Sequence, residues 1–590
     1  MKSRARRVIQ WTRVLQFTGL FVLIVSAAAT LSLLPDARFD GPDIAMSQIG
    51  HRPEETKVAL WIRDEEDTDW PDTFRIRRAL SGDIVLEKTV PTAQTEDPAT
   101  GAHVIRLDWT EVREPGEYVL ELDGLGETEP FRVDADVYSE LFGASLRALT
   151  FQRCGMAVSL GDWKHGICHR ARVLELGDED RLRPLPGGWH DAGNYDRYVP
   201  PAAFAVWHLL VTQRDWELPG EAWSSDALGI PESGNGIPDI LDEARYELEW
   251  LLAMQREDGS VHHKLGKIDW TPVTRPEADH FRQYLYPVSS AATSGLVAVT
   301  ARAATAFEAY DSVFAARCLD AARAGWSWLT ENEGIVPAGG FRNPPEVLLK
   351  GGEYGDGQDE DERFWAAAEL WRATGDEDLL VACRTGFVRW PRIVERPMTW
   401  SSMSGAGFVA LLDRAIPVSE DDATNPNEQL REGLRRHARD VAEGIRSKGF
   451  PTVLGGGDYL WGSNAYALSS AVLMIVAAEL GEPDAEKVAL DQLHYVLGLN
   501  GLAQSFVTGF GWSSPRHPHH QPSQTDEIAE PVPGFLVGGP TRSAGGGGRP
   551  ALRYVDTFDS YHTNEVAINW NAPLVFVAGR WATSPQPEAR

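Results

Sequence analysis

Two carboxylic acids lie in polar and aromatic segments where each could take part in acid–base chemistry. Glu565 lies in YVDTFDSYHTNEVAINWNAP (554–573), and partial desolvation beside aromatic rings would keep its carboxyl protonated, as a general acid requires. Asp191 precedes Ala-Gly-Asn after a Gly-Gly-Trp turn, where it could orient or deprotonate a water molecule. Each residue also has a structural alternative: a solvated glutamate at a helix start for Glu565, and a helix N-cap for Asp191.

A second set of residues could bind a metal ion. Cys154, Cys168, His169 and His190 follow the spacing Cys-x13-Cys-His-x20-His. Zinc accepts two thiolates and two imidazoles in a tetrahedral arrangement, and four protein ligands make a closed, structural site. A metal there would rigidify the loop of Asp191, because His190 directly precedes it. The spacing is not that of the usual zinc finger, so two unrelated cysteines and two loop histidines remain the alternative.

Two acidic segments carry oxygen ligands of the kind that Ca²⁺ prefers. They are GDGQDEDER (355–363) and PESGNGIPDILDE (231–243), and neither fits the calcium-loop motif of helix–loop–helix proteins. A solvated acidic turn or a helix cap is the alternative for both. The other two cysteines, Cys318 and Cys383, lie in helix-like apolar patterns and are predicted to be buried thiols.

The composition indicates a large, acidic globular protein. The 590 residues exceed one ordinary domain, and 43% hydrophobic with 24% charged residues is typical of a chain that buries a large core. The formal net charge of −30 argues against nucleic-acid binding, since no basic stripe occurs outside the N-terminus. Four cysteines are too few for a disulfide-stapled scaffold of this size.

The N-terminal segment, residues 1–40, has the pattern of an export signal. Residues 1–13 contain five basic residues and no acid, and residues 14–34 carry no formal charge. The apolar run is long enough for one membrane span, with its basic flank in the cytoplasm. We therefore predict a single-span anchor, with signal-peptide cleavage near residues 27–29 as the alternative. Either way the remainder of the chain is expected outside the cytoplasm.

The rest of the chain divides into two patterns. Residues 43–134 contain short alternating runs separated by turn clusters, such as KVALWI (57–62) and TFRIRRA (73–79), which predict a small β-sandwich. Residues 138–582 contain long segments with apolar residues at three- and four-residue spacing, such as 240–255, which predict a helical barrel or a stacked helical array. Polar and aromatic loops join these helices, and active sites on helical scaffolds are built from such loops.

Several of these segments resemble glycoside hydrolase family 9, the inverting cellulases, in the subgroup with an N-terminal immunoglobulin-like domain. The pattern Y-x-D-x4-Y-x3-E-x-A-x3-N-A, from Tyr554 to Ala572, fits the family's second active-site signature at every specified position. YLWGSN (459–464), SFVTGFG (505–511) and SGNGIPDILDEA (233–244) are also similar to family segments. The resemblance implies an immunoglobulin-like sandwich over 43–134 followed by an (α/α)6 barrel over 138–582.

The resemblance also implies roles for particular residues. It makes Glu565 the general acid of an inverting β-1,4-glucan hydrolase. It implies a structural zinc ion at the two cysteines and two histidines, and a calcium ion at Asp361 and Glu362. Candidate substrate-binding residues in the barrel loops are His519, Gln521, Trp461, Tyr561, Trp570 and Asp556.

Two departures from the family pattern concern the active site directly. The family motif is usually Asp-Ala-Gly-Asp, whose second Asp is the catalytic base, but this chain has Asn194 at that position. An amide does not accept a proton from water at neutral pH, so Asp191 becomes the candidate base. The usual Pro-x-x-Pro-His-His-Arg loop reads Pro515-Arg-His-Pro-His-His-Gln521 here. It keeps His519 but loses a substrate-contacting arginine.

Three functions follow from this combination. The first is hydrolysis of β-1,4-glucan with Asp191 as base. The second is exo-acting hydrolysis of another β-linked sugar such as glucosamine oligomers, since an acidic cleft suits a cationic amino sugar. The third is a catalytically weak, membrane-attached glycan-binding protein. We expect no separate carbohydrate-binding module after the barrel, which favours soluble or short glucans as substrates, and we expect a monomer.

Overall fold

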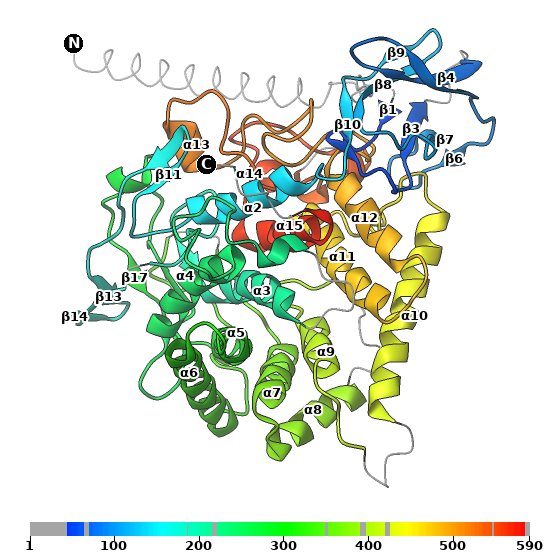
Figure 1. The fold of residues 1–590 in the computed structure, drawn as a ribbon. Coiled ribbons are helices and arrows are strands. Elements are labelled where there is room, and N and C mark those ends of the chain that lie inside the picture. Colours follow the sequence, from blue (N-terminus) through cyan, green and yellow to red (C-terminus); the bar gives the residue numbers. More distant parts are fainter. Residues whose placement is uncertain are drawn as a thin grey trace, which may run out of the picture.

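The computed structural model describes residues 44–63, 70–185, 187–214, 221–348, 352–389, 397–418, 425–544 and 548–583. Figure 1 shows a small group of strands followed by a larger helical part. The predicted N-terminal anchor lies outside the described residues. Among the residues that are described, no helix has the length and apolar character needed to cross a membrane.

The N-terminal part is a β-sandwich. One sheet has the order β1-β3-β7-β6, and the other has the order β2-β10-β8-β4-β5 with β9 paired to β8. Alternate side chains of both sheets point inward and form one buried core, which includes Trp61, Ile105 and Leu120. The strands are β1 (Ile44–Ala45), β2 (Gly50–His51), β3 (Val58–Arg63), β4 (Thr73–Arg78), β5 (Ile84–Thr89), β6 (Thr95–Glu96), β7 (His103–Asp108), β8 (Gly116–Leu122), β9 (Gly126–Glu127) and β10 (Phe131–Val133).

The second part consists mainly of helices joined by long loops. Helices such as α5 and α11 are buried almost all round, whereas α10 buries only a stripe of residues four or more positions apart and exposes the rest. The helices are α2 (Ser139–Phe151), α3 (Val199–Leu210), α4 (Asp239–Met254), α5 (Ser290–Ala306), α6 (Ser312–Glu331), α7 (Glu360–Thr374), α8 (Glu377–Arg389), α9 (Ser404–Leu412), α10 (Pro426–Arg446), α11 (Ser463–Glu479), α12 (Ala485–Val496), α13 (Gln521–Thr525), α14 (Tyr561–Asn564) and α15 (Ile568–Trp581).

Short strands and 3-10 turns brace the loops of the helical part. One two-stranded sheet pairs β11 with β12, and a five-stranded sheet has the order β14-β13-β17-β16-β15. The strands are β11 (Val158–Leu160), β12 (Trp163–His165), β13 (Val173–Glu175), β14 (Asp178–Arg183), β15 (Arg197–Tyr198), β16 (Lys264–Gly266) and β17 (Tyr284–Leu285). The 3-10 turns are η1 (Val211–Gln213), η2 (Glu221–Ser224), η3 (Pro276–Ala278), η4 (Arg542–Ala544) and η5 (Pro550–Leu552).

The periodicity of the sequence correctly locates several of these elements. The alternating runs at 57–62 and 73–79 form β3 and β4, and the helical pattern at 240–255 forms α4. Helix α5 begins at residue 290, and its start is fixed by the hydroxyl of Ser289, which accepts a hydrogen bond from the backbone N–H of Ala292. The predicted buried thiols, Cys318 and Cys383, are both fully buried.

The sandwich packs on the helical part near α12 (Figure 1). An apolar cluster joins side chains of β1, β3 and β7 to Phe450, Leu499 and Ala503 of the helical part. Gln48 extends this contact, because its amide donates to the carbonyl of Ala503 (2.7 Å) and accepts from the backbone N–H of Ser513 (2.9 Å). The loop that follows α12 is therefore held by the sandwich.

Candidate active site

Asp191 lies on a loop held tightly by backbone hydrogen bonds. Its N–H donates to the carbonyl of Asp196 (2.9 Å), and its own carbonyl accepts from Ile568 at the start of α15 (2.8 Å). The side chain is 2% exposed. Its Oδ2 accepts a hydrogen bond from the hydroxyl of Tyr354 (2.7 Å), while Oδ1 has no donor among the described residues. One carboxylate oxygen is thus available to a water molecule.

Glu565 lies directly after α14, where its own backbone is extended, three residues before α15 begins. It forms an isolated parallel bridge with His519, and its carbonyl accepts from the backbone N–H of Gly538 (2.9 Å). The backbone N–H of Gly193 acts on its carboxylate and lowers its pKa. Gly193 belongs to the Asp191 loop, so the two carboxylic acids predicted from the sequence lie in one site.

The electrostatics of the two acids differ from those of exposed carboxylates. Burial raises the pKa of Asp191 to about 7; the Tyr354 hydrogen bond opposes this rise and the charge of Asp196 adds to it. Burial and the charge of Asp191 raise the pKa of Glu565 to about 8, and the backbone N–H of Gly193 opposes this rise. Near neutral pH this pair therefore holds one proton on Glu565 while Asp191 is ionised in part.

An exposed aromatic group lies beside Glu565. Trp461 and Tyr561 are 44% and 42% exposed, and their ring centroids lie 5.8 Å apart. The imidazole of His519 lies 5.9 Å from the Tyr561 ring, and its Nδ1 bonds to the carbonyl of Phe558 (2.6 Å). Exposed aromatic faces of this kind can stack on a sugar ring. Three of the predicted substrate-binding residues thus lie next to one of the two acids.

The other predicted substrate-binding residues make contacts within the protein. Asp556 accepts hydrogen bonds from the backbone N–H groups of Arg516 (2.7 Å) and His517 (2.9 Å) and from the side chain of Asn564 (2.9 Å). It therefore ties the loop of His519 to the Glu565 segment. Gln521 is buried at the start of α13, where its side-chain oxygen accepts from the N–H of Thr274 (3.4 Å). Trp570 is partly buried and packs against Gly462 and Gly538.

Asn194 takes a structural role within its own loop. Its side-chain oxygen accepts a hydrogen bond from the backbone N–H of Asp196 (3.0 Å), a local turn that Asn and Asp both form. Asp196 is itself buried and bonds to the N–H of Lys267 (3.1 Å) and the hydroxyl of Tyr198 (3.3 Å). Both carboxylate oxygens of Asp196 accept hydrogen bonds from the protein. Asp191 is therefore the residue of this loop whose carboxylate can act on a water molecule.

Tyr354 is the residue of the site that sequence reasoning missed. It lies 163 residues from Asp191 in the chain and adopts a left-handed backbone conformation with φ of 44°. Both Asp191 and Glu565 act on its hydroxyl and, with burial, raise its pKa well above the usual value. A lone tyrosine in an irregular Gly-Gly-Glu-Tyr segment carries no motif, so nothing in the sequence marks it.

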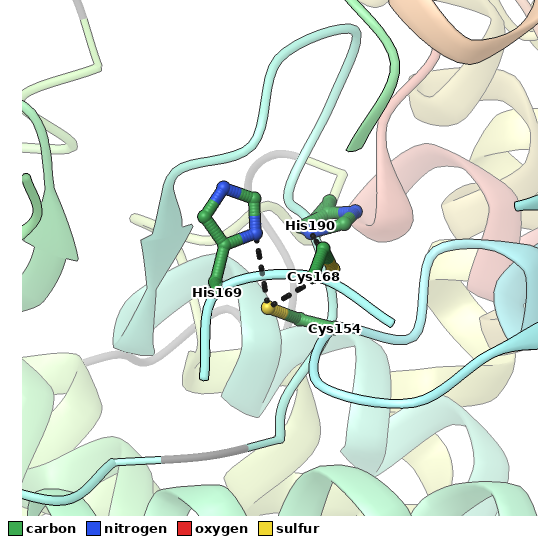
Figure 2. Close-up of side chains that lie close together, drawn as sticks. All are labelled: Cys154, Cys168, His169 and His190. Carbon is green, nitrogen blue, oxygen red and sulfur yellow. Dashed lines mark hydrogen bonds between the residues drawn. The ribbon is translucent and has the colours of Figure 1, made fainter. Parts of the chain in front are cut away.

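The four predicted zinc ligands come together in one buried cluster, which Figure 2 shows. The two sulfur atoms lie 3.8 Å apart, Cys154 Sγ lies 3.5 Å from His169 Nδ1, and Cys168 Sγ lies 3.6 Å from His190 Nε2. The far ring nitrogen of His169 lies 3.5 Å from a carboxylate oxygen of Asp279. These two thiols and two imidazoles converge on a common centre, and the sulfur separation is far too long for a disulfide.

The predicted calcium ligands also lie together. Glu362 is 3% exposed, and neither of its carboxylate oxygens has a hydrogen-bond donor within the described part of the chain. Burial and the charges of Asp361 and Asp356 raise its pKa well above the usual value. Asp361 accepts from the backbone N–H of Met403 (2.7 Å). Three carboxylates thus share a volume in which they repel one another without a cation.

Comparison with known proteins identifies the family. The Glycosyl hydrolase family 9 model matches residues 138–578, and the Cellulase N-terminal ig-like domain model matches residues 40–127. The chain belongs to glycosyl hydrolase family 9. Endoglucanase D of Acetivibrio thermocellus is 32% identical to it over 590 residues, covering 98% of this chain and 86% of that protein.

Solved structures of family 9 share the fold. A metagenome-derived family 9 endoglucanase superposes with a TM-score of 0.83 at 34% identity, covering 91% of this chain and 98% of that one. A Zn-binding triple mutant of the family 9 endoglucanase J30 gives 0.82 at 31% identity, covering 90% and 100%. The predicted fold class, a β-sandwich followed by an (α/α)6 barrel, is confirmed. The family 9 chain is a glycosidase of the endo-β-1,4-glucanase class.

Proposed function

We propose that the chain hydrolyses β-1,4-glucan with inversion, using Glu565 as general acid and Asp191 as general base. The observation that carries this proposal is that two carboxyl groups with raised pKa values lie in one site, with the pKa of Glu565 above that of Asp191. Glu565, with its raised pKa, keeps a proton for the leaving oxygen, while Asp191 offers the unoccupied Oδ1 to a water molecule. A single chain contains both groups, so a monomer suffices for the reaction.

The aromatic group supports the choice of substrate. Trp461 and Tyr561 present exposed ring faces beside Glu565, and His519 lies next to them. We assign these three residues to direct sugar contact. Trp570 packs against Gly462, the residue after Trp461. Asp556 and Gln521 form hydrogen bonds within the loops that carry the sugar contacts. Gln521 supplies no charge, so a neutral glucan suits this subsite.

The test is turnover of β-1,4-glucans, cello-oligosaccharides and glucosamine oligomers by the purified protein. We expect the wild type to release α-configured products from the first two, as inversion requires. Asp191→Ala and Glu565→Gln should each reduce kcat/KM by about 10²–10⁴-fold. Asp269→Ala and Glu530→Gln, which change exposed carboxylates, serve as matched controls.

Three other outcomes would contradict the proposal. Turnover of glucosamine oligomers alone would favour an exo-acting hydrolase of amino sugars. Glucan binding without turnover in any variant would favour a binding protein. An inert wild type whose Asn194→Asp variant is active would show that Asp191 cannot replace the missing carboxylate at position 194.

For the cluster of Cys154, Cys168, His169 and His190 we propose a structural zinc ion. Ligands at about 2.3 Å from a tetrahedral centre lie about 3.8 Å apart, which is the separation of the two sulfur atoms. The Zn-binding J30 variant is a structural neighbour with the same overall fold. Zinc would fix His190 and hence the position of Asp191 beside it. Asp279 would orient His169 through its outer nitrogen.

For Asp361 and Glu362 we propose a calcium ion, with Asp356 as a further ligand. The support is the set of buried, unpartnered carboxylate oxygens on Glu362 and Asp356, since hard oxygen ligands are those that Ca²⁺ prefers.

We further propose that the protein is exported and held by its N-terminal segment, or secreted after cleavage. The support is the basic flank and the uncharged run at residues 14–34. Cell fractionation with an antibody to the barrel separates these two states.

A further inference from the structure

A second group of potential metal ligands lies where the sandwich meets the helical domain. His51 ends β2, Glu55 lies in the loop that follows, and His494 lies in the last turn of α12. One ligand atom from each residue lies within 4.8 Å of the others. None of the three side chains is more than 8% exposed. The group is therefore a buried set of two imidazoles and one carboxylate.

Several polar atoms of this group lack a protein partner. Neither ring nitrogen of His51 has a hydrogen bond to any described residue, and the same holds for Oε1 of Glu55. Buried polar atoms are nearly always satisfied, because an unmade hydrogen bond costs free energy without compensation from water. Three such atoms in one small volume indicate that a species other than the protein completes the group.

The geometry suits a divalent transition metal. Oε2 of Glu55 lies 3.8 Å from Nδ1 of His51 and 3.8 Å from Nε2 of His494. Ligands about 2.0–2.2 Å from zinc lie about 3.3–3.6 Å apart, so a shift of a few tenths of an ångström would bring these atoms into coordination. The Tyr138 hydroxyl lies 2.8 Å from both Glu55 Oε2 and His494 Nε2 and holds them in place.

The charges around the group restrict how an ion could bind. Both rings are buried, and coordination by Nε2 of His494 would replace its contact with the Tyr138 hydroxyl. The positive charges of Lys57 and Lys487 act on these rings. The charge of Glu55 attracts a cation and the two lysines oppose it, so coordination bonds must supply most of the binding energy, which favours a transition metal over Ca²⁺ or Mg²⁺.

We propose that His51, Glu55 and His494 bind one divalent transition-metal ion, with Zn²⁺ as the expected species, and that this ion fastens the sandwich to α12. The ligands come from both sides of the domain boundary, so the ion acts as a cross-link between them. This site is separate in the chain from the cluster of Cys154, Cys168, His169 and His190, which lies on other elements.

The first test is the amount of zinc that the full chain retains after chelation, reloading with Zn²⁺ and desalting. We expect His494→Gln to retain one ion fewer than the wild type. His208→Gln, which removes an equally buried imidazole from α3, should retain as many as the wild type. Cys168→Ser should lose a different ion and keep the one proposed here. Equal zinc in the wild type and in His494→Gln would overturn the proposal.

A second test needs no variant at the site and so does not depend on whether His494→Gln folds. Co²⁺ is added stepwise to the metal-free wild type. Thiolate ligands give a strong charge-transfer band, whereas imidazole and carboxylate ligands give only weaker d–d bands. We expect d–d absorbance to keep rising after the charge-transfer band has saturated. If both bands stop after a single equivalent of cobalt, the histidine–glutamate group holds no metal and only water completes it.

Discussion

At Asp191, opposing influences set the pKa of a single carboxyl. Burial and the neighbouring Asp196 raise it, and the hydroxyl of Tyr354 lowers it, with a net value of about 7. Glu565, affected by burial and by the charge of Asp191, reaches about 8. The form with Asp191 ionised and Glu565 protonated is therefore most populated between these values, and kcat/KM should pass through a maximum there.

Replacing Tyr354 by Phe should move the acid limb of this profile to higher pH. The hydrogen bond from the hydroxyl favours ionised Asp191, so its loss lets burial raise the pKa of Asp191 above about 7. Activity should then fall more at pH 6 than at pH 8, as measured by the pH dependence of kcat/KM. Tyr286→Phe, which removes another buried hydroxyl that bonds to a backbone carbonyl, is the control. An unmoved acid limb in Tyr354→Phe would contradict the assignment.

Replacing Asp191 by Asn should abolish turnover and yet stabilise the protein. The pKa of Asp191 is raised from 3.8 to about 7 on folding, so between these values the folded state holds a proton that the unfolded state has released. Stability contributed by this residue is therefore lost as pH rises from about 4 to about 7. Asn carries no charge, and Asp191→Asn should exceed the wild type by about 1–3 kcal/mol at pH 8.

Urea unfolding at pH 4 and at pH 8 measures this difference. The two proteins should have similar stabilities at pH 4, where the carboxyl is protonated in the folded wild type and only about half ionised in the unfolded chain. Asp269→Asn changes an exposed carboxylate and should show no such pH dependence. A stability difference that stays the same at both pH values would show that burial does not disfavour the charge of Asp191.

At the scale of elements, the site is an assembly of loops rather than of helices. The Asp191 loop, the segment 515–521 and the segment 554–565 meet through backbone contacts. The carbonyl of Gly193 accepts from the N–H of Gln521 (2.9 Å), and the N–H of His519 donates to the carbonyl of Asn564 (2.8 Å). Asp556 adds the side-chain bonds that hold the second and third segments together.

Adding one methyl group at Gly193 should disturb this assembly selectively. A Cβ at this position would lie 2.2 Å from the carbonyl oxygen of His519, so Gly193→Ala must push the Asp191 loop away from the segment 515–521, which is bridged to Glu565 through His519. We expect kcat to fall about 10²-fold, because a misplacement of about 1 Å between reacting groups has that cost, while the helices stay folded. Steady-state kinetics and circular dichroism measure the two effects.

The matched control is Gly457→Ala, where the added methyl group meets open space. It should leave both kcat and the folded structure unchanged. If Gly193→Ala is as active as Gly457→Ala, the contact between the two loops does not set the position of the catalytic acids.

The sequence predicted those parts of the fold and site that follow from local patterns. The motif around Glu565 and the alternation of β3 and β4 are readable because each depends on neighbours in the chain. Tyr354 was not readable, since only the folded loops bring it to Asp191. The motif also placed Asp556 in the site without distinguishing a sugar contact from the loop contacts that it makes. Similarly, the pairing of His51 with His494 depends on how two domains dock.

At the scale of the whole molecule, the sandwich is part of the support of the active site. Gln48 is 4% exposed and contacts the loop after α12 through both ends of its amide. That loop continues through Ser513 directly into the segment 515–521, which carries His519. The N-terminal domain thus helps to position the loop of His519 through the hydrogen bonds of Gln48. These bonds add to the apolar contacts between the two domains.

Replacing Gln48 by Ala should therefore weaken both stability and substrate binding. It leaves the carbonyl of Ala503 and the N–H of Ser513 without their partner, which costs about 2–4 kcal/mol for two buried groups. Hydrogen exchange should quicken in residues 504–513, and KM should rise more than kcat falls, because the catalytic acids lie on other segments. Gln94→Ala, on an exposed part of the sandwich, should change neither. Unchanged exchange in Gln48→Ala would mean that the helical domain holds this loop without the sandwich.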